Sequence, residues 1–321
     1  MPMPSRHRRE VSVALATGAL GLVLLLVAPS FFSRENIADI FLANLPVLIV
    51  ALGTTLVILT GQIDISVGSV FAIAGVMAGL LAKAGLPLVL VVAGACATGA
   101  ALGALNGALV AYVRIPSIVA TLATMVALRD ALRWGTDGAW IQDLPPRFQW
   151  LGLGQIGYPI LAGAIAFALY AALAWTLRHL PAGRAVYATG SHADAARLAG
   201  IRTPFVTYAV FLLAGGLTGL AALLNAVRFN QIPSNAGMGL EMKVIAAVVV
   251  GGTAISGGRG SVTGTLLGVI LLGAIGPALT FLGVSAYWER AIQGAIILTA
   301  VAADALRDRP LTHAAVAAGR A

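Results

Sequence analysis

The sequence predicts an all-α, polytopic membrane bundle, and three observations lead to this fold class. Of the 321 residues, 59% are hydrophobic and only 10% are charged, whereas an ordinary soluble domain carries about 25% charged residues. The mean hydropathy is +0.94. Apolar runs long enough to cross a bilayer recur along most of the chain. So few charges cannot cover a soluble surface, which argues against a soluble enzyme, a disordered protein or a fibrous protein.

About ten spans follow from the apolar runs. They are expected near residues 11–29, 40–60, 65–82, 88–113, 116–134, 158–177, 206–227, 241–256, 262–283 and 286–304. The first run follows Arg6, Arg8 and Arg9 and resembles a secretory signal, but it is long enough to span, so we expect a retained helix. The segments 65–82 and 241–256 are short and interrupted by glycine, so each is either a full span or a broken, re-entrant one.

The basic residues set the expected orientation. With a cytoplasmic N-terminus and ten crossings, twelve fall on the cytoplasmic side: Arg6, Arg8, Arg9, Arg114, Arg178, Arg184, Arg197, Arg202, Arg259, Arg307, Arg309 and Arg320. The outer loops then hold four: Arg34, Lys83, Arg147 and Arg228. The remaining four, Arg129, Arg133, Lys243 and Arg290, lie near span ends, from which their side chains are expected to reach the membrane surface. This asymmetry agrees with the positive-inside rule, and it explains the net charge of +8 without a nucleic-acid partner. We expect cytoplasmic tails at 1–10 and 306–321 around a transmembrane domain at 11–305, with a large cytoplasmic loop at 178–205.

Small residues recur four apart within several of these spans. The repeats include Gly99, Gly103 and Gly107 in one span and Gly215 and Gly219 in another. Such spacing places small residues on one helix face and predicts closely packed helices in a membrane.

A polar break at 59–69 separates the second and third spans. It contains Gly61, Asp64, Ser66 and Gly68. A carboxylate beside the hydrocarbon core is unfavourable unless it finds a partner, water or a helix end. Asp64 or Ser66 is therefore expected to cap the next helix. The break is also a candidate for the lining or the hinge of a translocation path, and these two interpretations are compatible.

The cytoplasmic loop 178–205 contains a short helix with signals at both ends. Ser191 and Asp194 have the spacing of a capping box, Ala195 and Ala196 propagate the helix, and Gly200 is placed to end it in a left-handed conformation. A helix this short is marginal in water, so it must dock on something. The surface that receives it is either the chain's own membrane domain or a partner protein.

The stretch 241–260 is rich in glycine, including Gly251, Gly252, Gly257 and Gly258, which permit turns and close backbone approach. It lacks the lysine pattern of a phosphate-binding loop, so no nucleotide site is expected here. Glu241 and Lys243 are two residues apart and point to different helix faces.

The chemistry-bearing residues exclude several functions. Cys96 is the only cysteine, and the histidines His7, His179, His192 and His313 lie in the tails or the cytoplasmic loop. We therefore expect no catalytic residues and no metal site, which disfavours a membrane-embedded enzyme. Asp64 alone is thin support for an ion-coupled carrier. A neutral solute is expected, with energy supplied from elsewhere.

Several motifs, read together, resemble one family, the ribose-type permease subunits of bacterial ABC importers for monosaccharides, which are related to branched-chain amino-acid permeases. They comprise 61–69, Asn106-Gly107, Ile115-Pro116 through Leu122, Tyr187 through Gly190 with Ala195-Ala196 and Gly200-Ile201, and 245–260 with Gly264-Thr265. The resemblance covers about residues 40–305. One departure is Gly190-Ser191-His192, where these permeases often carry Gly-Gly-Asn.

The resemblance implies an ABC importer permease fold in the bacterial inner membrane, with both termini cytoplasmic. The cytoplasmic helix would couple to a separate ATPase subunit through Gly190, Ser191, Asp194, Ala195, Ala196 and Gly200. The translocation path or hinge would involve Gly61, Asp64, Ser66, Gly68, Asn106, Gly251, Gly252, Gly257 and Gly258. This chain would bind no cofactor, since ATP and Mg would sit on the ATPase. A periplasmic sugar-binding protein would dock on outer loops, and a second permease chain, identical or different, would complete the pore.

The implied function is import of a monosaccharide driven by ATP. The stretches 128–134 and 148–150 look most like rhamnose-type permeases, with autoinducer-2 and ribose permeases as close alternatives. A branched-chain amino-acid ABC permease and an ion-coupled secondary sugar carrier are the other candidates. Trp134, Trp140 and Trp150 around the outer loop 135–157 are expected to form an interfacial belt or to receive an external partner.

Overall fold

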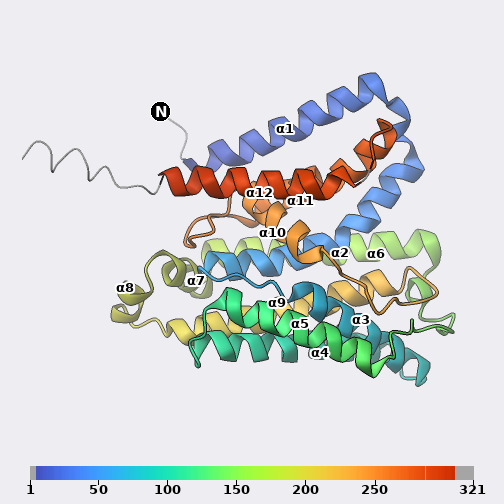
Figure 1. Cartoon of the computed structure of the whole chain (residues 1–321), viewed down its shortest axis with the longest axis horizontal. Coiled ribbons are helices and arrows are strands. Elements are labelled where there is room, and N and C mark those ends of the chain that lie inside the picture. Colours follow the sequence, from blue (N-terminus) through green and yellow to red (C-terminus); the bar gives the residue numbers. More distant parts are fainter. Residues whose placement is uncertain (1–4, 286, 308–321) are drawn as a thin grey trace, which may run out of the picture.

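The computed structural model describes residues 5–285 and 287–307, and it confirms the predicted all-α bundle. Figure 1 shows long helices lying side by side, with short helices at one end. The elements in the described residues are α1 (Ser5–Val27), η1 (Pro29–Phe32), α2 (Arg34–Leu59), α3 (Val67–Lys83), α4 (Leu88–Ala111), α5 (Ser117–Gly135), η2 (Gln149–Gly152), α6 (Gly154–His179), α7 (Pro181–Ser191), α8 (Ala193–Leu198), α9 (Thr203–Ala226), α10 (Leu240–Val250), α11 (Val262–Phe281) and α12 (Trp288–Arg307).

Each predicted span contains a helix, but these helices differ in their fitness to cross a membrane. Among the described residues, six stretches, in α1, α2, α4, α6, α9 and α11, are long and apolar enough to do so, and α3 is a shorter apolar helix of 17 residues. The expected span at 241–256 is helical only to Val250. Its 11 residues are about 16 Å long, roughly half of a hydrocarbon core. The helix ends there because Gly251 and Gly252 turn the chain, with φ +94° at Gly252.

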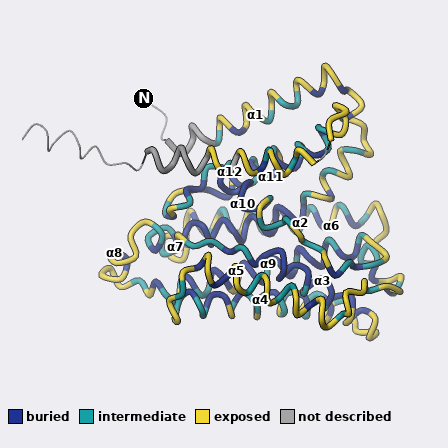
Figure 2. The backbone as a smooth tube through the Cα atoms, viewed as in Figure 1, coloured by how far each residue is buried: buried dark blue, intermediate teal, exposed yellow. Residues whose placement is uncertain are grey.

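α2 lies at the centre of the bundle and α1 at its edge. Of the apolar stretch of α2, 89% is buried within the protein, compared with 11% for α1. Figure 2 shows the same contrast, with dark buried backbone along α2 and exposed backbone along α1. Because the membrane, and not water, surrounds such a bundle, the exposed apolar residues of α1 are compatible with the fold.

α4 and α9 are closely packed, and glycines bring these two helices together. A Cβ added to Gly99 would lie 2.8 Å from the Gly219 backbone nitrogen, and one added to Gly103 would lie 2.9 Å from the Gly215 Cα. No real side chain tolerates such contacts with backbone. The predicted packing through small residues is therefore confirmed for these two helices.

The segment 60–66 turns back into the bundle before α3 begins. It follows α5, since the Ile63 N–H donates to Ser117 Oγ (3.1 Å) and the Ile65 N–H donates to Thr121 Oγ1 (3.1 Å). Further along, the Ser69 hydroxyl donates to the Met125 carbonyl (2.7 Å). Eight residues of α5 separate Ser117 from Met125, or about 12 Å. The first turn of α3 therefore lies inside the bundle.

The segment 227–239 enters the bundle from the opposite end. Ile232 forms an isolated antiparallel bridge with Ile141 of the loop after α5, and its side chain packs where a Cβ on Gly79 of α3 would stand. Further along, a Cβ added to Gly237 would lie 2.7 Å from the Gly68 carbonyl oxygen. Gly79 and Gly68 are about 16 Å apart along α3. Both short predicted spans thus begin inside the bundle, after a non-helical segment, and they meet at Gly68 and Gly237.

Both ends of the described chain lie at the same end of the bundle. In Figure 1 the start of α1 and the end of α12 lie on the left, as do α7 and α8. This agrees with an even number of crossings. Which side of the membrane this end faces remains the prediction drawn from the basic residues.

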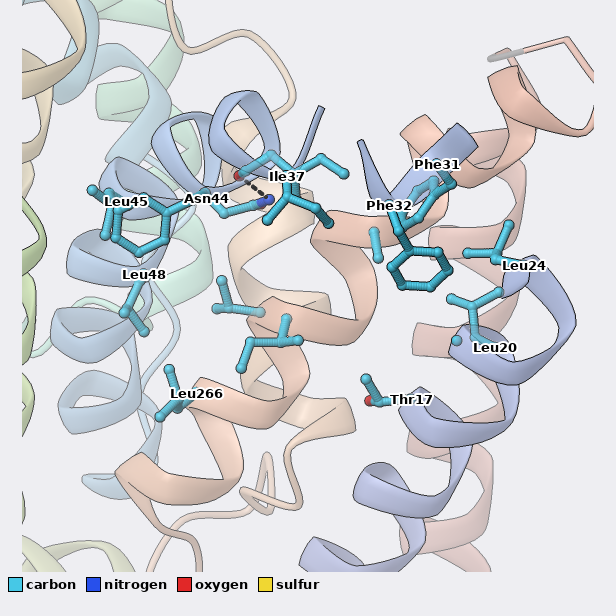
Figure 3. A pocket seen from close by; sticks show the side chains of 16 residues that line it. Thr17, Leu20, Leu24, Phe31, Phe32, Ile37, Asn44, Leu45, Leu48 and Leu266 are labelled. Carbon is cyan, nitrogen blue, oxygen red and sulfur yellow. Dashed lines mark hydrogen bonds between the residues drawn. The ribbon is translucent and has the colours of Figure 1, made fainter. Parts of the chain in front are cut away.

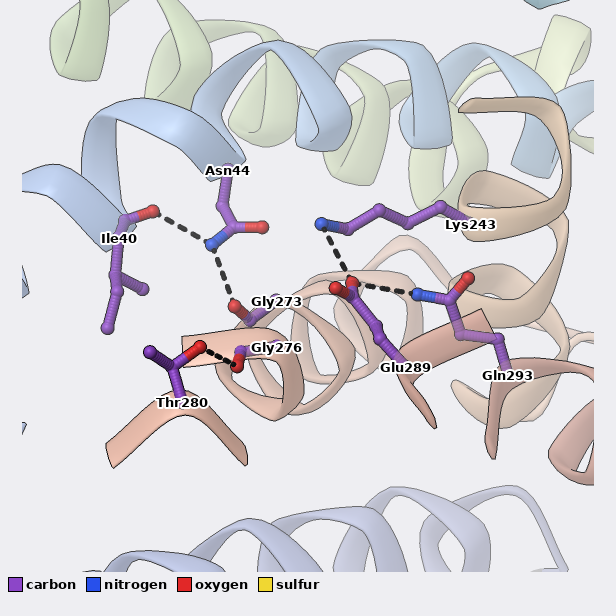
Figure 4. A network of polar contacts seen from close by, with 8 residues as sticks. All are labelled: Ile40, Asn44, Lys243, Gly273, Gly276, Thr280, Glu289 and Gln293. Carbon is purple, nitrogen blue, oxygen red and sulfur yellow. Dashed lines mark hydrogen bonds and ion pairs between the residues drawn. The ribbon is translucent and has the colours of Figure 1, made fainter. Parts of the chain in front are cut away.

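A polar cluster joins α10 to α12 (Figure 4). Lys243 Nζ lies 3.7 Å from Glu289 Oε1, and Gln293 Nε2 donates to the same oxygen (3.0 Å). The two charged side chains are only 27% and 26% exposed. Lys243 was expected to reach the membrane surface, but it pairs within the protein. Ionised groups in such a place are stable only when paired.

Replacing Lys243 with Met is expected to destabilise the protein, because Glu289 then loses its cation. The loss should stay below the roughly 3–5 kcal/mol of a fully buried pair, since both groups retain some exposure. Thermal unfolding of the purified protein in detergent measures it. The double variant Lys243→Met/Glu289→Gln should recover most of the loss, and additive effects of the two substitutions would contradict the pairing.

Candidate functional site

Three stretches that the sequence singled out meet at one point, which we call the glycine junction (Gly61, Gly190, Gly257 and Gly258). α2 ends at Leu59, whose carbonyl accepts a hydrogen bond from the Gly258 N–H (2.9 Å). A Cβ on Gly190 would overlap that same carbonyl. The end of α2, the end of α7 and the loop after α10 are therefore in backbone contact.

The other glycines of the junction are constrained as well, each in its own way. A Cβ on Gly257 would lie 2.7 Å from the Gly61 nitrogen and 3.0 Å from the Gly190 carbonyl oxygen. A Cβ on Gly258 would lie 2.7 Å from the Ser191 Cα. Gly61, Gly257 and Gly258 also have φ of +75°, +85° and +70°, a conformation that L side chains rarely adopt. Glycine is required at Gly257 and Gly258 both by space and by backbone conformation, and at Gly61 by backbone conformation alone.

A side-chain hydrogen bond supports the junction from α7. The Tyr187 hydroxyl donates to the Gly260 carbonyl (2.9 Å). Together with Gly190 this gives α7 two separate attachments to the loop that links α10 to α11. A displacement of α7 would therefore act on that loop and on the end of α2.

The short helix α8 differs in detail from the prediction. Ser191 does not cap it but is the last residue of α7, and the N-cap is His192, whose Nδ1 accepts from the Ala195 N–H (3.3 Å). The expected capping box of Ser191 and Asp194 is therefore wrong. The chain stays helical up to Ser191 because Pro181 opens a helix that His192, in an extended conformation, interrupts.

The remaining predicted features of α8 are present. It comprises six residues, and Gly200 follows with φ +85°, as expected of a left-handed terminus. Asp194 pairs with Arg197 on its surface. Ala196 is buried against the protein, whereas Ala195 is exposed and Leu198 is 91% exposed. α8 thus rests on the bundle by one residue and presents an apolar side chain outward.

Asp64, Ser66 and Asn106 form a buried hydrogen-bonded chain. The Ser66 N–H and hydroxyl both donate to Asp64 Oδ1 (2.8 and 2.6 Å), and Asn106 Nδ2 donates to Ser66 Oγ (2.7 Å). All three are at most 3% exposed. Asp64 therefore holds Ser66, the N-cap residue of α3, in place. Ser66 makes no side-chain capping bond and Asp64 accepts only from Ser66, so the expected cap on the free N–H groups of α3 is not formed. Their burial means that they do not line an open surface in this conformation.

Two charged residues that the sequence analysis did not select lie where the non-helical segments meet. Arg129 Nη1 donates to the Ala236 carbonyl (2.8 Å), and Glu241 Oε1 accepts from the Gly239 N–H (3.2 Å). A Cβ on Gly68 would overlap Glu241 Oε2 and lie 3.4 Å from Arg129 Nη2. Arg129 was expected to reach the membrane surface near a span end, but it fastens the segment 227–239 to α5. Arg129 lies in α5 and Glu241 in α10, with four α-helices between them in the chain, so no local signal would have identified them together.

Gly251 and Gly252 have a packing role. A Cβ on Gly251 would lie 2.7 Å from the Thr265 nitrogen, so α10 and α11 are in backbone contact there. Gly252 turns the chain toward the junction. Of the residues predicted for a path or hinge, the structure gathers Gly61, Gly257 and Gly258 at the junction, and it places the others in the adjoining breaks and helix contacts.

Comparison with known proteins identifies relatives over nearly the whole chain. Residues 36–301 match the family model described as "Branched-chain amino acid transport system / permease component". The "Autoinducer 2 import system permease protein LsrC" of Escherichia coli (strain K12 / DH10B) is 36% identical, over 93% of this chain and 87% of that protein. The protein of the same name from Photorhabdus laumondii is 34% identical, over 93% and 90%, and that from Salmonella typhi is 36% identical, over 93% and 86%. No solved structure gives a significant match.

Replacing Gly190 with Ala is expected to destabilise the protein by about 1–3 kcal/mol, because the new methyl group must displace the Leu59 carbonyl. Thermal unfolding in detergent measures the loss. The matched control is Gly135→Ala at the end of α5, where a Cβ meets nothing within 4 Å. Equal unfolding temperatures for both variants would show that the junction is not tightly packed.

Proposed function

The chain belongs to the family of branched-chain amino acid transport system permease components, and from this premise we propose that it is the permease subunit of an ATP-driven importer for autoinducer 2 or a monosaccharide. It is a transport component and not an enzyme. The observation that carries the proposal is the glycine junction, which links the exposed α7–α8 region to the start of the polar break before α3.

In this proposal α8 docks in a groove of a separate ATPase subunit, which binds ATP and Mg. α8 comprises only six residues, so it needs a receiving surface. Its contact with the bundle through Ala196 leaves Asp194, Ala195 and Leu198 available to a partner. An exposed apolar side chain beside an exposed ion pair is consistent with such a docking surface.

The junction supplies a route from that partner to the membrane. When the ATPase moves α8 and α7, Gly190 presses on the Leu59 carbonyl and on the loop at Gly257 and Gly258. Gly61 then moves the segment 60–66, which leads into α3 and is fastened to α5 through Ser117 and Thr121. Helices packed this closely shift as units, which suits alternating inward and outward openings.

The outer loop 135–157 is proposed to receive an exported solute-binding protein. Trp134 is 86% exposed and Trp140 is 46% exposed. Trp150, by contrast, packs its ring edge-on against Tyr158 at 5.4 Å, and its backbone N–H donates to the Val227 carbonyl. Two of the three indoles are therefore free to contact a partner. A second permease chain is proposed to complete the pore.

The relatives named for autoinducer 2 favour this solute over rhamnose, which the outer-loop stretches suggested. The family description names branched-chain amino acids. The charge balance supports a neutral, hydroxylated solute, since Arg129 and Glu241 near Gly68 carry opposite charges and each makes a hydrogen bond to backbone.

Proteoliposomes test the proposal. They should contain the chain with the ATPase that co-purifies with it, and labelled autoinducer 2, rhamnose, ribose and leucine are supplied with their binding proteins. Uptake of autoinducer 2 or a sugar is expected only with ATP on the ATPase side. Uptake by this chain alone under a proton or sodium gradient would contradict the proposal, and uptake of leucine alone would transfer it to amino acids.

Replacing Ala195 with Glu is expected to abolish ATP-dependent uptake while the protein folds normally, because this exposed position accepts a larger side chain but the partner's groove does not. The ratio of solute transported to ATP hydrolysed measures the effect, with Gly200→Pro as a second variant that breaks the left-handed terminus. Ala84→Glu, an exposed alanine at the other end of the bundle, is the control. Normal transport by both coupling variants would remove α8 from the mechanism.

A further inference from the structure

A groove of about 400 Å³ separates α1 from α2 and α11 (Figure 3). Leu20 and Leu24 of α1 face Leu45 and Leu48 of α2 across this space, and Leu266 of α11 lines it near Leu48. Apart from Thr17 and Asn44 the lining is apolar, and the Thr17 hydroxyl is already bonded to the Val13 carbonyl (2.9 Å). The size lies within the range of roughly 300–1,000 Å³ that is typical of small-molecule sites.

The groove cannot close, because α1 is held to α11 at both ends. At one end Phe31 packs edge-on against Phe281 at 5.6 Å, in a small core with Leu24 and Ala278. At the other end the Ser261 hydroxyl donates to Glu10 Oε1 (2.5 Å). An empty groove would leave its apolar lining without dispersion contacts. Something of apolar character must therefore fill it.

The groove lies between three helices that are apolar and long enough to cross a membrane, so the surrounding solvent is hydrocarbon. An unbranched chain suits a long, narrow, apolar space. The lining of α2 follows helical spacing, with Ile37, Phe41, Leu45 and Leu48 on one face.

Arg34, the first residue of α2, falls on this same face, three residues before Ile37 and seven before Phe41. Its acidic neighbours Glu35 and Asp39 fall on other faces of the helix. A cation therefore stands at the end of the groove opposite α7 and α8, at the depth where a bilayer changes from hydrocarbon to headgroups. Guanidinium and phosphate groups pair in a fork geometry.

We propose that this groove holds an acyl chain of a phospholipid, from the leaflet opposite α7 and α8, with the lipid phosphate on Arg34. The lipid fills the space that α1 cannot close and so completes the packing of α1 on the bundle. This site is separate from the glycine junction and does not depend on the transported solute.

Two glycines of α1 provide a matched test. Gly21 lines the groove and Gly18 does not, and a Cβ on either meets nothing within 4 Å. Gly21→Phe should therefore fill the groove without a backbone clash, while Gly18→Phe adds the same side chain toward the membrane. Native mass spectrometry of the full-length protein, purified in mild detergent and titrated with phosphatidylglycerol and with diacylglycerol, measures lipid binding.

The wild-type protein and Gly18→Phe are expected to retain one phosphatidylglycerol, and Gly21→Phe to lose it. Arg34→Gln should weaken phosphatidylglycerol binding about tenfold and leave diacylglycerol, which lacks the phosphate, unchanged. Equal lipid binding by Gly21→Phe and Gly18→Phe would overturn the proposal. The proposal would also be overturned if the wild-type protein formed a dimer without bound lipid and Gly21→Phe dissociated that dimer. In that case a second copy of the chain, and not a lipid, would occupy the groove.

Discussion

Close contact between backbones is the constraint on which the rest of this structure depends. At the glycine junction, the end of α2, the end of α7 and the loop after α10 leave no room for a Cβ atom at Gly190 or Gly258. The Leu59 carbonyl accepts the Gly258 N–H across this point. Elements in such contact cannot slide past one another independently. The mechanical link from the α7–α8 region to the membrane core is therefore built from backbone atoms.

The backbone contacts at the junction connect to two non-helical segments inside the bundle. The segment 60–66 leaves the junction and follows α5 inward, and the segment 227–239 enters from the other end along α3. The segment 60–66 leads into α3, whose first turn contacts the segment 227–239 at Gly68 and Gly237, and Arg129 and Glu241 hold backbone groups near this contact. Backbone without helical hydrogen bonds is tolerated at membrane depth only where it is buried in protein, as it is here. The meeting point is thus the part of the bundle that is best placed to rearrange.

The sequence predicted where the helices and their ends lie better than it predicted the contacts between them. Apolar runs located the helices, and Gly200 was correctly placed as a left-handed helix terminus. The cap of α8 was misplaced by one residue, because the imidazole of His192 can accept a hydrogen bond just as the Ser191 hydroxyl can. The contacts of Gly190 with Leu59 and of Arg129 with Ala236 join residues far apart in the chain. No local pattern encodes such long-range contacts, which arise only when the helices pack.

The most direct test of the link follows movement at the far end of the bundle. Spin labels at Lys83→Cys on α3 and Ile156→Cys on α6, with Cys96 replaced by Ala, report a distance remote from α8. It is measured in the complex with the ATPase, with and without a non-hydrolysable ATP analogue. The account predicts that the nucleotide shifts this distance and that Gly258→Ala suppresses the shift. A distance unaffected by nucleotide, in a complex that binds it, would contradict the account.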